Sequence, residues 1–165
     1  MITISELIQE FEAEAQTTRR VLERVPSDKL AWSPHAKSMS LGTLAMHLAQ
    51  APGAISAWPV PDDFEFSGDP TPVPTCTEDI LAAHDRGLTR VRENLEAIGD
   101  GGLTAMWTAR AGGKTLMTMP KAVAVRALLM NHTYHHRGQL SVYLRLLDVP
   151  VPAIYGPSAD ESPFA

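Results

Sequence analysis

The sequence predicts an all-α protein, a helical bundle that carries one small β-hairpin. Four long segments place apolar side chains at the three- and four-residue spacing of a helix face. Proline or glycine follows each of these segments, as is typical where helices end. The pair Gly112-Gly113 lies between two runs of β-forming residues, which is a hairpin pattern. Long amphipathic helices bury their apolar stripes by packing together, so a bundle is the expected architecture.

The first two helices are expected at about 5–25 and 40–58. Apolar residues recur on one face of the first segment, and Pro26 ends it. Ser40 precedes the second segment and is its expected N-cap. Pro52 lies inside the second helix and is expected to bend or weaken its middle.

A proline-rich segment, "PVPDDFEFSGDPTPVPT", separates the second helix from the third. It contains five prolines and is predicted to be a surface loop. The third helix is expected at about 78–98, with Thr75 and Glu78 forming a capping box before it. After the hairpin, Pro120 opens the fourth helix, which is expected to reach about residue 147.

Composition sets limits on the class of protein. The 165 residues suit a single domain, here taken as 1–165, with 44% hydrophobic and 20% charged residues. A net charge of −5 and the lack of a basic cluster argue against nucleic acid or a membrane as partner. The single cysteine, Cys76, excludes an internal disulfide and a cysteine-based zinc site. Without a signal peptide or a long apolar run, a cytoplasmic location is expected.

The stretch "NHTYHHRGQL" contains three of the six histidines. Residues four apart lie on one face of a helix, so His132 and His136 are expected near the middle of the apolar face of the fourth helix. His135 falls at the margin of that face, and Gln139 lies one turn beyond it. Thr133 and Arg137 are expected to point away from the core, and His84 to face solvent.

Two neighbouring buried imidazoles point to a metal site. An unpaired buried polar group costs about 1–3 kcal/mol, and a divalent metal removes that cost by binding neutral imidazole nitrogens. His47 of the second helix is the candidate third ligand. Three histidines without an acidic ligand leave coordination positions open, which is a catalytic pattern.

Other interpretations of these residues stay open at this stage. The histidines could be satisfied core residues, or His132 could pair with His135 in place of His136. His135 could instead support a ligand or lie on the surface. Gln139 could orient a ligand imidazole or make an ordinary polar contact. Zinc-protease chemistry is excluded, because Thr133 occupies the place of the glutamate base in H-E-x-x-H.

The segments "MHLAQ", "NHTYHHRGQLSVYLRLLDV" and "VPAIYGPSADE" together resemble the DinB/YfiT-like family of helical metalloproteins, which is not the DNA polymerase of similar name. The resemblance implies a four-helix bundle of the down-up-up-down type, with a long link between the second and third helices. It implies zinc or nickel on three histidines, here His47, His132 and His136, and frequent homodimers. It gives no physical role to Tyr155 or Asp160.

The resemblance also implies an activity. Several members resemble metal-dependent transferases or isomerases that use a low-molecular-weight thiol such as bacillithiol, mycothiol or glutathione. The first hypothesis is therefore a thiol-dependent transferase that acts on a small electrophilic molecule. The alternatives are a metal-dependent hydrolase, for which no glutamate base lies beside the histidines, and a non-catalytic metal-binding stress-response protein.

Overall fold

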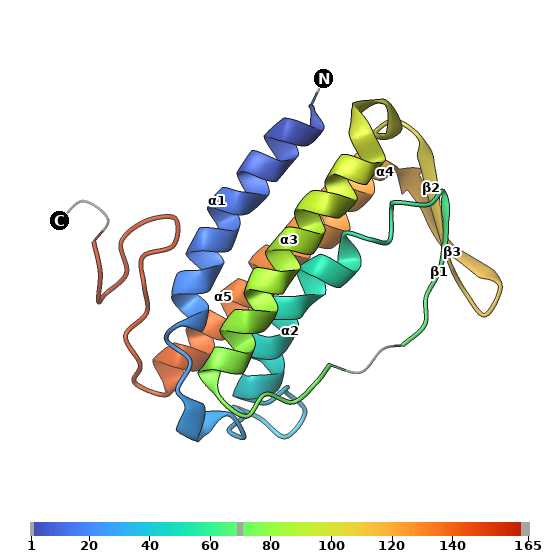
Figure 1. Cartoon of the computed structure of the whole chain (residues 1–165). Coiled ribbons are helices and arrows are strands. Elements are labelled where there is room, and N and C mark those ends of the chain that lie inside the picture. Colours follow the sequence, from blue (N-terminus) through green and yellow to red (C-terminus); the bar gives the residue numbers. More distant parts are fainter. Residues whose placement is uncertain (1, 69–70, 163–165) are drawn as a thin grey trace.

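A computed structural model describes residues 2–68 and 71–162 and is mostly helical, with a small three-stranded sheet (Figure 1). Residues 1, 69–70 and 163–165 lie outside the described part, so it leaves out two residues of the expected loop and both ends of the expected 1–165 domain. In chain order the elements are α1 (Ile4–Leu22), η1 (Ser27–Lys29), α2 (Leu41–Ile55), β1 (Asp63–Glu65), α3 (Thr77–Gly102), β2 (Met106–Ala111), β3 (Lys114–Pro120), α4 (Lys121–Ala124), η2 (Val125–Met130) and α5 (Asn131–Leu146).

The expected caps hold at α2 and shift by one residue at α3. The Ser40 hydroxyl accepts a hydrogen bond from the Thr43 amide at 3.1 Å, as an N-cap does. At α3 the N-cap is Cys76, and the side chain of Asp79 accepts from the Thr75 amide at 2.8 Å. The prediction of Glu78 as the capping acid was therefore wrong, because the N-cap lies one residue later than expected, and Asp79 is then the third residue of the helix. Gly99 interrupts α3 with a φ of 64°, which agrees with the expected end of that helix.

The long helices pack side by side, each against two others. Helix α2 contacts α3 and α5, and α1 contacts the same two helices. Helices α1 and α5 run in one direction while α2 and α3 run in the other (Figure 1). Two large apolar clusters fill the space between them. Leu129 of η2 belongs to one cluster and Leu140 of α5 belongs to the other. His132 and His136 lie between these two leucines in the sequence. No helix within residues 2–68 and 71–162 is long and apolar enough to cross a bilayer.

Helices α2 and α3 approach closely where two glycines face each other. A Cβ atom added at Gly87 would lie 2.9 Å from the Ala49 carbonyl oxygen, and one at Gly53 would lie 3.0 Å from the Gly87 Cα. Both obstacles are backbone atoms, which cannot swing aside as a side chain does. The close contact between α2 and α3 therefore requires glycine, which has no Cβ atom, at both positions.

We expect Gly87→Ala to lower the free energy of unfolding by about 1–3 kcal/mol, because the overpacked methyl group separates two helix backbones. The better helix propensity of alanine, worth about 1 kcal/mol, offsets only part of this loss. Gly138→Ala on α5 is the control, since nothing lies within 4 Å of its added Cβ and it gains propensity without a clash. Urea unfolding followed by circular dichroism measures both. An unchanged or raised stability of Gly87→Ala would contradict the close approach.

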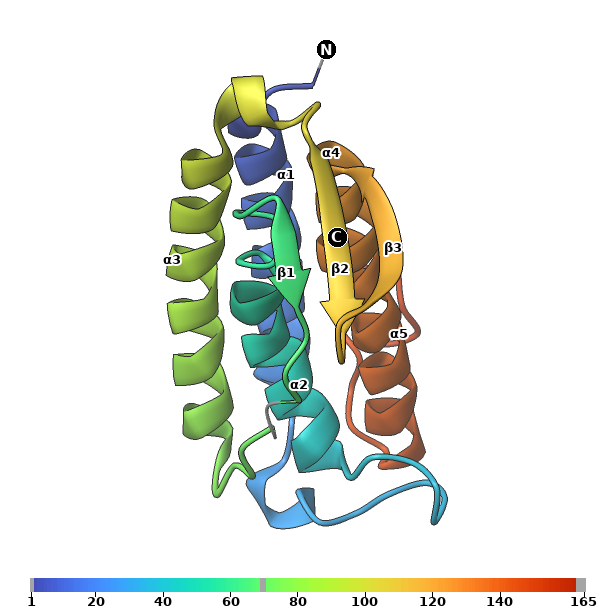
Figure 2. The ribbon, with the colours of Figure 1, turned by 90° about the vertical axis from the view of Figure 1, so that its right-hand side faces the viewer.

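The sheet contains the expected hairpin and one further strand. Strands β2 and β3 pair antiparallel through a turn in which Gly112 and Gly113 have positive φ angles of 56° and 75°. Strand β1 pairs parallel with β2, with Asp63 opposite Thr108. Figure 2 shows β1 beside the hairpin. The prediction of a plain loop before α3 was wrong at this point, because three residues between prolines are too short to show a strand pattern.

The chain after α5 returns along the outside of α1 and is held there by ionic contacts (Figure 1). Asp160 accepts hydrogen bonds from Arg145 and from the Val151 amide. Glu161 forms ion pairs with Arg20 of α1 and with Arg24, which lies just after that helix. These contacts give the acidic residues of "YGPSADE" a structural role that the sequence did not reveal: they fasten the C-terminal segment to the helices.

Candidate metal centre

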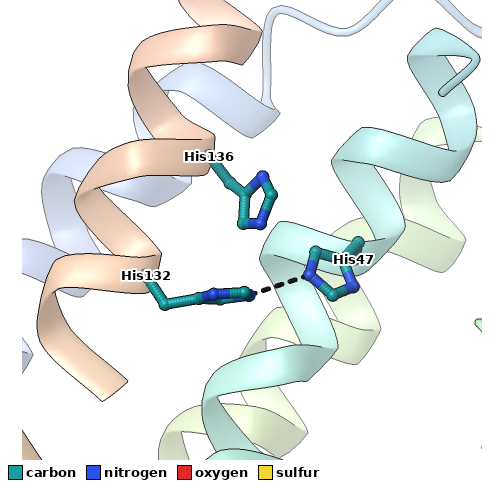
Figure 3. Close-up of side chains that lie close together, drawn as sticks. All are labelled: His47, His132 and His136. Carbon is teal, nitrogen blue, oxygen red and sulfur yellow. Dashed lines mark hydrogen bonds between the residues drawn. The ribbon is translucent and has the colours of Figure 1, made fainter. Parts of the chain in front are cut away.

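The structure brings His47, His132 and His136 together from two helices (Figure 3). Their potential ligand nitrogens all lie within 4.8 Å of one another, and the Nε2 atoms of His47 and His132 are 2.9 Å apart. His136 is buried, and the other two are half-buried. His135 is exposed, and its ring lies edge-on to that of His136, at a centroid distance of 4.8 Å. The structure therefore groups His136, and not His135, with the other two.

A π-helical turn precedes the two histidines of α5. The segment η2, Val125–Met130, has about one more residue in its turn than an α-helix has. In α5, which follows, the buried face is therefore shifted by one residue along the sequence. As a result Thr133 and Arg137 are buried, with 3% and 1% of their surfaces exposed, and Leu146 is 57% exposed. The expectation that Thr133 and Arg137 point away from the core was wrong, because it assumed a uniform 100° per residue.

The expectation for His84 was also wrong. Only 6% of His84 is exposed, and burial lowers the pKa of its imidazole. Its Nδ1 lies 3.5 Å from a carboxylate oxygen of the neighbouring Asp85. The charged neighbour in the sequence does not mark a solvent-facing position, because the imidazole turns inward while Asp85 stays exposed.

Gln139 contacts the cluster through His136. The Gln139 Oε1 lies 2.7 Å from the His136 Nδ1. An amide oxygen only accepts, so Nδ1 carries the proton, and the lone pair of Nε2 remains free. A partner of this kind fixes the orientation of a metal-binding imidazole. The role of Gln139 in supporting a ligand stays a prediction, and this contact is the geometry that it requires.

The surroundings of the three imidazoles favour their neutral form. Burial, followed by the nearby imidazoles of His136 and His47, lowers the pKa of His132 to about 4. Burial also lowers the pKa values of His47 and His136. Ligand nitrogens about 2.0–2.1 Å from a tetrahedral ion lie roughly 3.3 Å apart, close to the spacing of His47 and His132. Neutral nitrogens at this spacing fit a divalent transition metal.

These pKa shifts predict that the metal-free protein loses stability in acid. An unfolded histidine titrates near 6.5 and folded His132 near 4, so the unfolded chain binds the extra proton between these values. The contribution of His132 is therefore present above about pH 6.5 and is lost as the pH falls towards 4. We expect His132→Gln to lose less stability than wild type between pH 7 and pH 4.5, as measured by urea unfolding of metal-free protein. The same pH dependence in both proteins would contradict this assignment.

Arg137 ties the histidine-bearing helix to α1. Its guanidinium pairs with the Glu14 carboxylate at 2.7 Å and donates to the Glu14 carbonyl and the Thr18 hydroxyl. The Tyr155 hydroxyl accepts from Arg137 and donates to Glu14, and the guanidinium carbon lies 4.9 Å from the centre of the Tyr155 ring. Since Arg137 follows His136 directly, this contact fixes the rotation of α5 at the cluster.

A pocket of about 330 Å³ opens beside the cluster, with His47 and His132 in its wall. The open side of the histidine cluster therefore faces a space large enough for a small molecule.

Comparisons with known proteins agree with this architecture. Residues 1–163 match the model of the DinB family. The chain is 25% identical over 162 residues to the protein YrdA of Bacillus subtilis (strain 168), covering 96% of this chain and 92% of YrdA. A crystal structure of a DinB-like protein from Bacillus cereus ATCC 10987 is 27% identical, with a TM-score of 0.73, and covers 93% of this chain and 98% of that one.

A second crystal structure, of the DinB-like protein YjoA from Bacillus subtilis, has a TM-score of 0.67 over 89% of this chain and 96% of that one. The two sequences are 16% identical, so this likeness concerns the fold alone.

Proposed function

Because the chain belongs to the DinB family, we propose that it binds one divalent transition-metal ion, zinc or nickel, and uses it in thiol-dependent transfer to small electrophiles. The ligands are His47, His132 and His136. The observation that carries the proposal is the convergence of three neutral imidazoles beside an open pocket. The proposed frame is a four-helix bundle of the down-up-up-down type, and the packing of α2 against α3 and α5 supports it.

A divalent cation held by the three histidines would lower the pKa of a thiol bound to it, so that the thiolate would predominate at neutral pH. In the proposed reaction the thiol sulfur forms a bond to an electrophilic carbon of the substrate. The leaving group departs with its bonding electrons and takes up the thiol proton. One thiol and one substrate thus give a thioether and a protonated leaving group.

The residues of the chain have separate tasks in this proposal. The three imidazoles supply neutral donors and leave coordination positions open. Gln139 holds His136 with Nε2 free, through the 2.7 Å contact at Nδ1. The pocket binds the substrate next to His47 and His132.

The hydrolase alternative has less support. Hydrolysis needs a base to take a proton from water, and in residues 2–68 and 71–162 no carboxylate belongs to the histidine cluster or lines the pocket. The non-catalytic alternative makes a different prediction, namely bound metal without turnover.

Metal analysis followed by an activity screen tests the proposal. Untagged protein is loaded with zinc or nickel, dialysed, and analysed for metal by mass spectrometry. It is then assayed with bacillithiol, mycothiol or glutathione and 1-chloro-2,4-dinitrobenzene, whose product absorbs light. The proposal expects about one metal ion per chain and thiol-dependent product that His136→Ala abolishes and His135→Ala retains. Thiol-independent turnover of ester substrates would support the hydrolase, and stoichiometric metal without any turnover would support the binding protein.

We further propose a homodimer, a single domain and a cytoplasmic location. Val142 and Leu146 support the first of these, because they lie one turn apart on α5 and are 56% and 57% exposed. Light scattering coupled to size-exclusion chromatography tests the dimer, and a monomeric mass at micromolar concentration would exclude it.

A further inference from the structure

The pocket beside the histidines has an aromatic wall that the metal proposal does not use. Trp58 in the turn after α2, Phe64 in β1 and Phe66 just after that strand form this aromatic wall. The pocket has a volume of about 330 Å³. A cavity of about 150 Å³ holds a benzene molecule, so there is room for a ring with a substituent that reaches the histidines.

We propose that this pocket selects substrates that carry a neutral, apolar ring and an electrophilic carbon directed towards His47 and His132. This inference rests on the proposed function, because it names the substrate class of the same site. It goes further by assigning specificity to Trp58, Phe64 and Phe66.

The geometry of the aromatic wall favours an apolar ring over a cationic head group. The ring centres of Trp58 and Phe66 are 4.7 Å apart at 89°, and those of Phe64 and Phe66 are 5.3 Å apart at 80°. The three rings thus pack edge-to-face against one another. They do not form a cage of separate ring faces around a common point, which is the arrangement that recognises quaternary ammonium groups. A flat ligand ring instead packs edge-to-face on the outer surface of such a group.

The charges around the pocket support the same class. Among the described residues that line it there is no Asp, Glu, Lys or Arg. Besides the histidines and the aromatic wall, the lining consists of Gly68, of apolar residues of α2 such as Ala54, and of three uncharged polar residues, Gln50, Ser67 and Thr71. Beside these described residues, a charged ligand group would lose its hydration without gaining a partner of opposite charge. A neutral ring loses little hydration and gains apolar contact.

The small sheet holds the aromatic wall in place. The indole N–H of buried Trp107 in β2 donates to the Trp58 carbonyl oxygen at 2.8 Å. The buried Lys121 ammonium donates to the Val60 carbonyl oxygen at 2.8 Å and pairs with Asp62. Strand β1 then pairs with β2 next to Phe64. The strands therefore position the pocket wall, and the segment they hold is a specificity element.

Nuclear magnetic resonance of ¹⁵N-labelled protein tests this inference without an activity assay. Metal-free protein is titrated with benzyl alcohol, benzoate and benzylammonium, which share a ring and differ in charge. Zinc-loaded protein is titrated with benzyl alcohol alone, because benzoate and benzylamine can also bind metal. We expect benzyl alcohol to shift the Trp58 indole signal in both forms and to bind metal-free protein at least about tenfold more tightly than the two ions.

Two variants and a control complete the test. Phe66→Leu removes a ring but keeps apolar bulk, and Ala54→Trp fills the pocket from an exposed lining position on α2. Both are expected to weaken benzyl alcohol binding at least about fivefold. Leu116→Ala is the control, because this side chain is 54% exposed on β3 and does not line the pocket.

Equal binding of the three probes, absent shifts, or shifts that persist in Ala54→Trp would overturn the inference. Selective binding of benzyl alcohol by a chain that takes up no metal would support the pocket and refute the proposed function. Bound metal without preference for the neutral ring would refute the pocket assignment alone.

Discussion

Replacing His136 by alanine is expected to weaken zinc binding by at least about a hundredfold. The variant loses one of three donors that converge within 4.8 Å, and it also loses the contact with Gln139. Zinc binding at sites with a full ligand set is worth about 10–16 kcal/mol, so one donor accounts for several kcal/mol. His132→Ala and His47→Ala are expected to show losses of similar size. Competition with a chromogenic chelator at pH 7 measures each dissociation constant.

His135→Ala is the matched control for that measurement. It removes an imidazole from the same helix turn, but this ring is exposed and outside the cluster, so the affinity is expected to change less than about threefold. Gln139→Leu is expected to give an intermediate loss of about 10–100-fold, the usual cost of removing a group that orients a ligand. Wild-type affinity in His136→Ala, or an equal loss in His135→Ala, would refute the three-histidine assignment.

The sequence was sufficient to place two of the three histidines together because their spacing is a matter of local geometry, whereas His47 comes from another helix. His132 and His136 lie four apart, and that spacing keeps both on one side of α5 whatever happens earlier in the helix. The DinB family prediction is confirmed by the match over residues 1–163. The faces of Thr133 and Arg137 depend on the absolute rotation of α5, which the π-turn at Val125–Met130 changes by one residue. No residue type in "VRALLM" marks such a turn, so periodicity could not reveal it.

Long-range contacts account for the rest of what the sequence did not give. Strand β1 has three residues and exists through its pairing with β2, more than forty positions later in the chain. The aromatic wall depends on this pairing, and so the pocket could not be derived from spacing along one helix. The acidic residues of "YGPSADE" likewise act through arginines of distant helices, such as Arg20 and Arg145.

Arg137→Ala is expected to lower the free energy of unfolding by about 3 kcal/mol or more. Only 1% of the Arg137 side chain is exposed, and its removal leaves the Glu14 carboxylate, itself 19% exposed, without its cation. Breaking a buried ion pair by removing one partner costs about 3–5 kcal/mol, because the remaining charge is not fully hydrated. The variant also loses the contacts with Thr18 and Tyr155.

Arg126→Ala is the control for this second prediction, because Arg126 of η2 also forms an ion pair with α1, through Glu10. Their side chains are 42% and 37% exposed, so the loss is expected to stay below about 1 kcal/mol. Urea unfolding of both metal-free variants, with equal slopes, gives the comparison. Because Arg137 adjoins His136, its variant is also expected to bind zinc more weakly, whereas Arg126→Ala keeps the wild-type affinity. A loss in Arg137→Ala no larger than that in Arg126→Ala would show that burial does not strengthen this contact, and that the rotation of α5 is set by its apolar face alone.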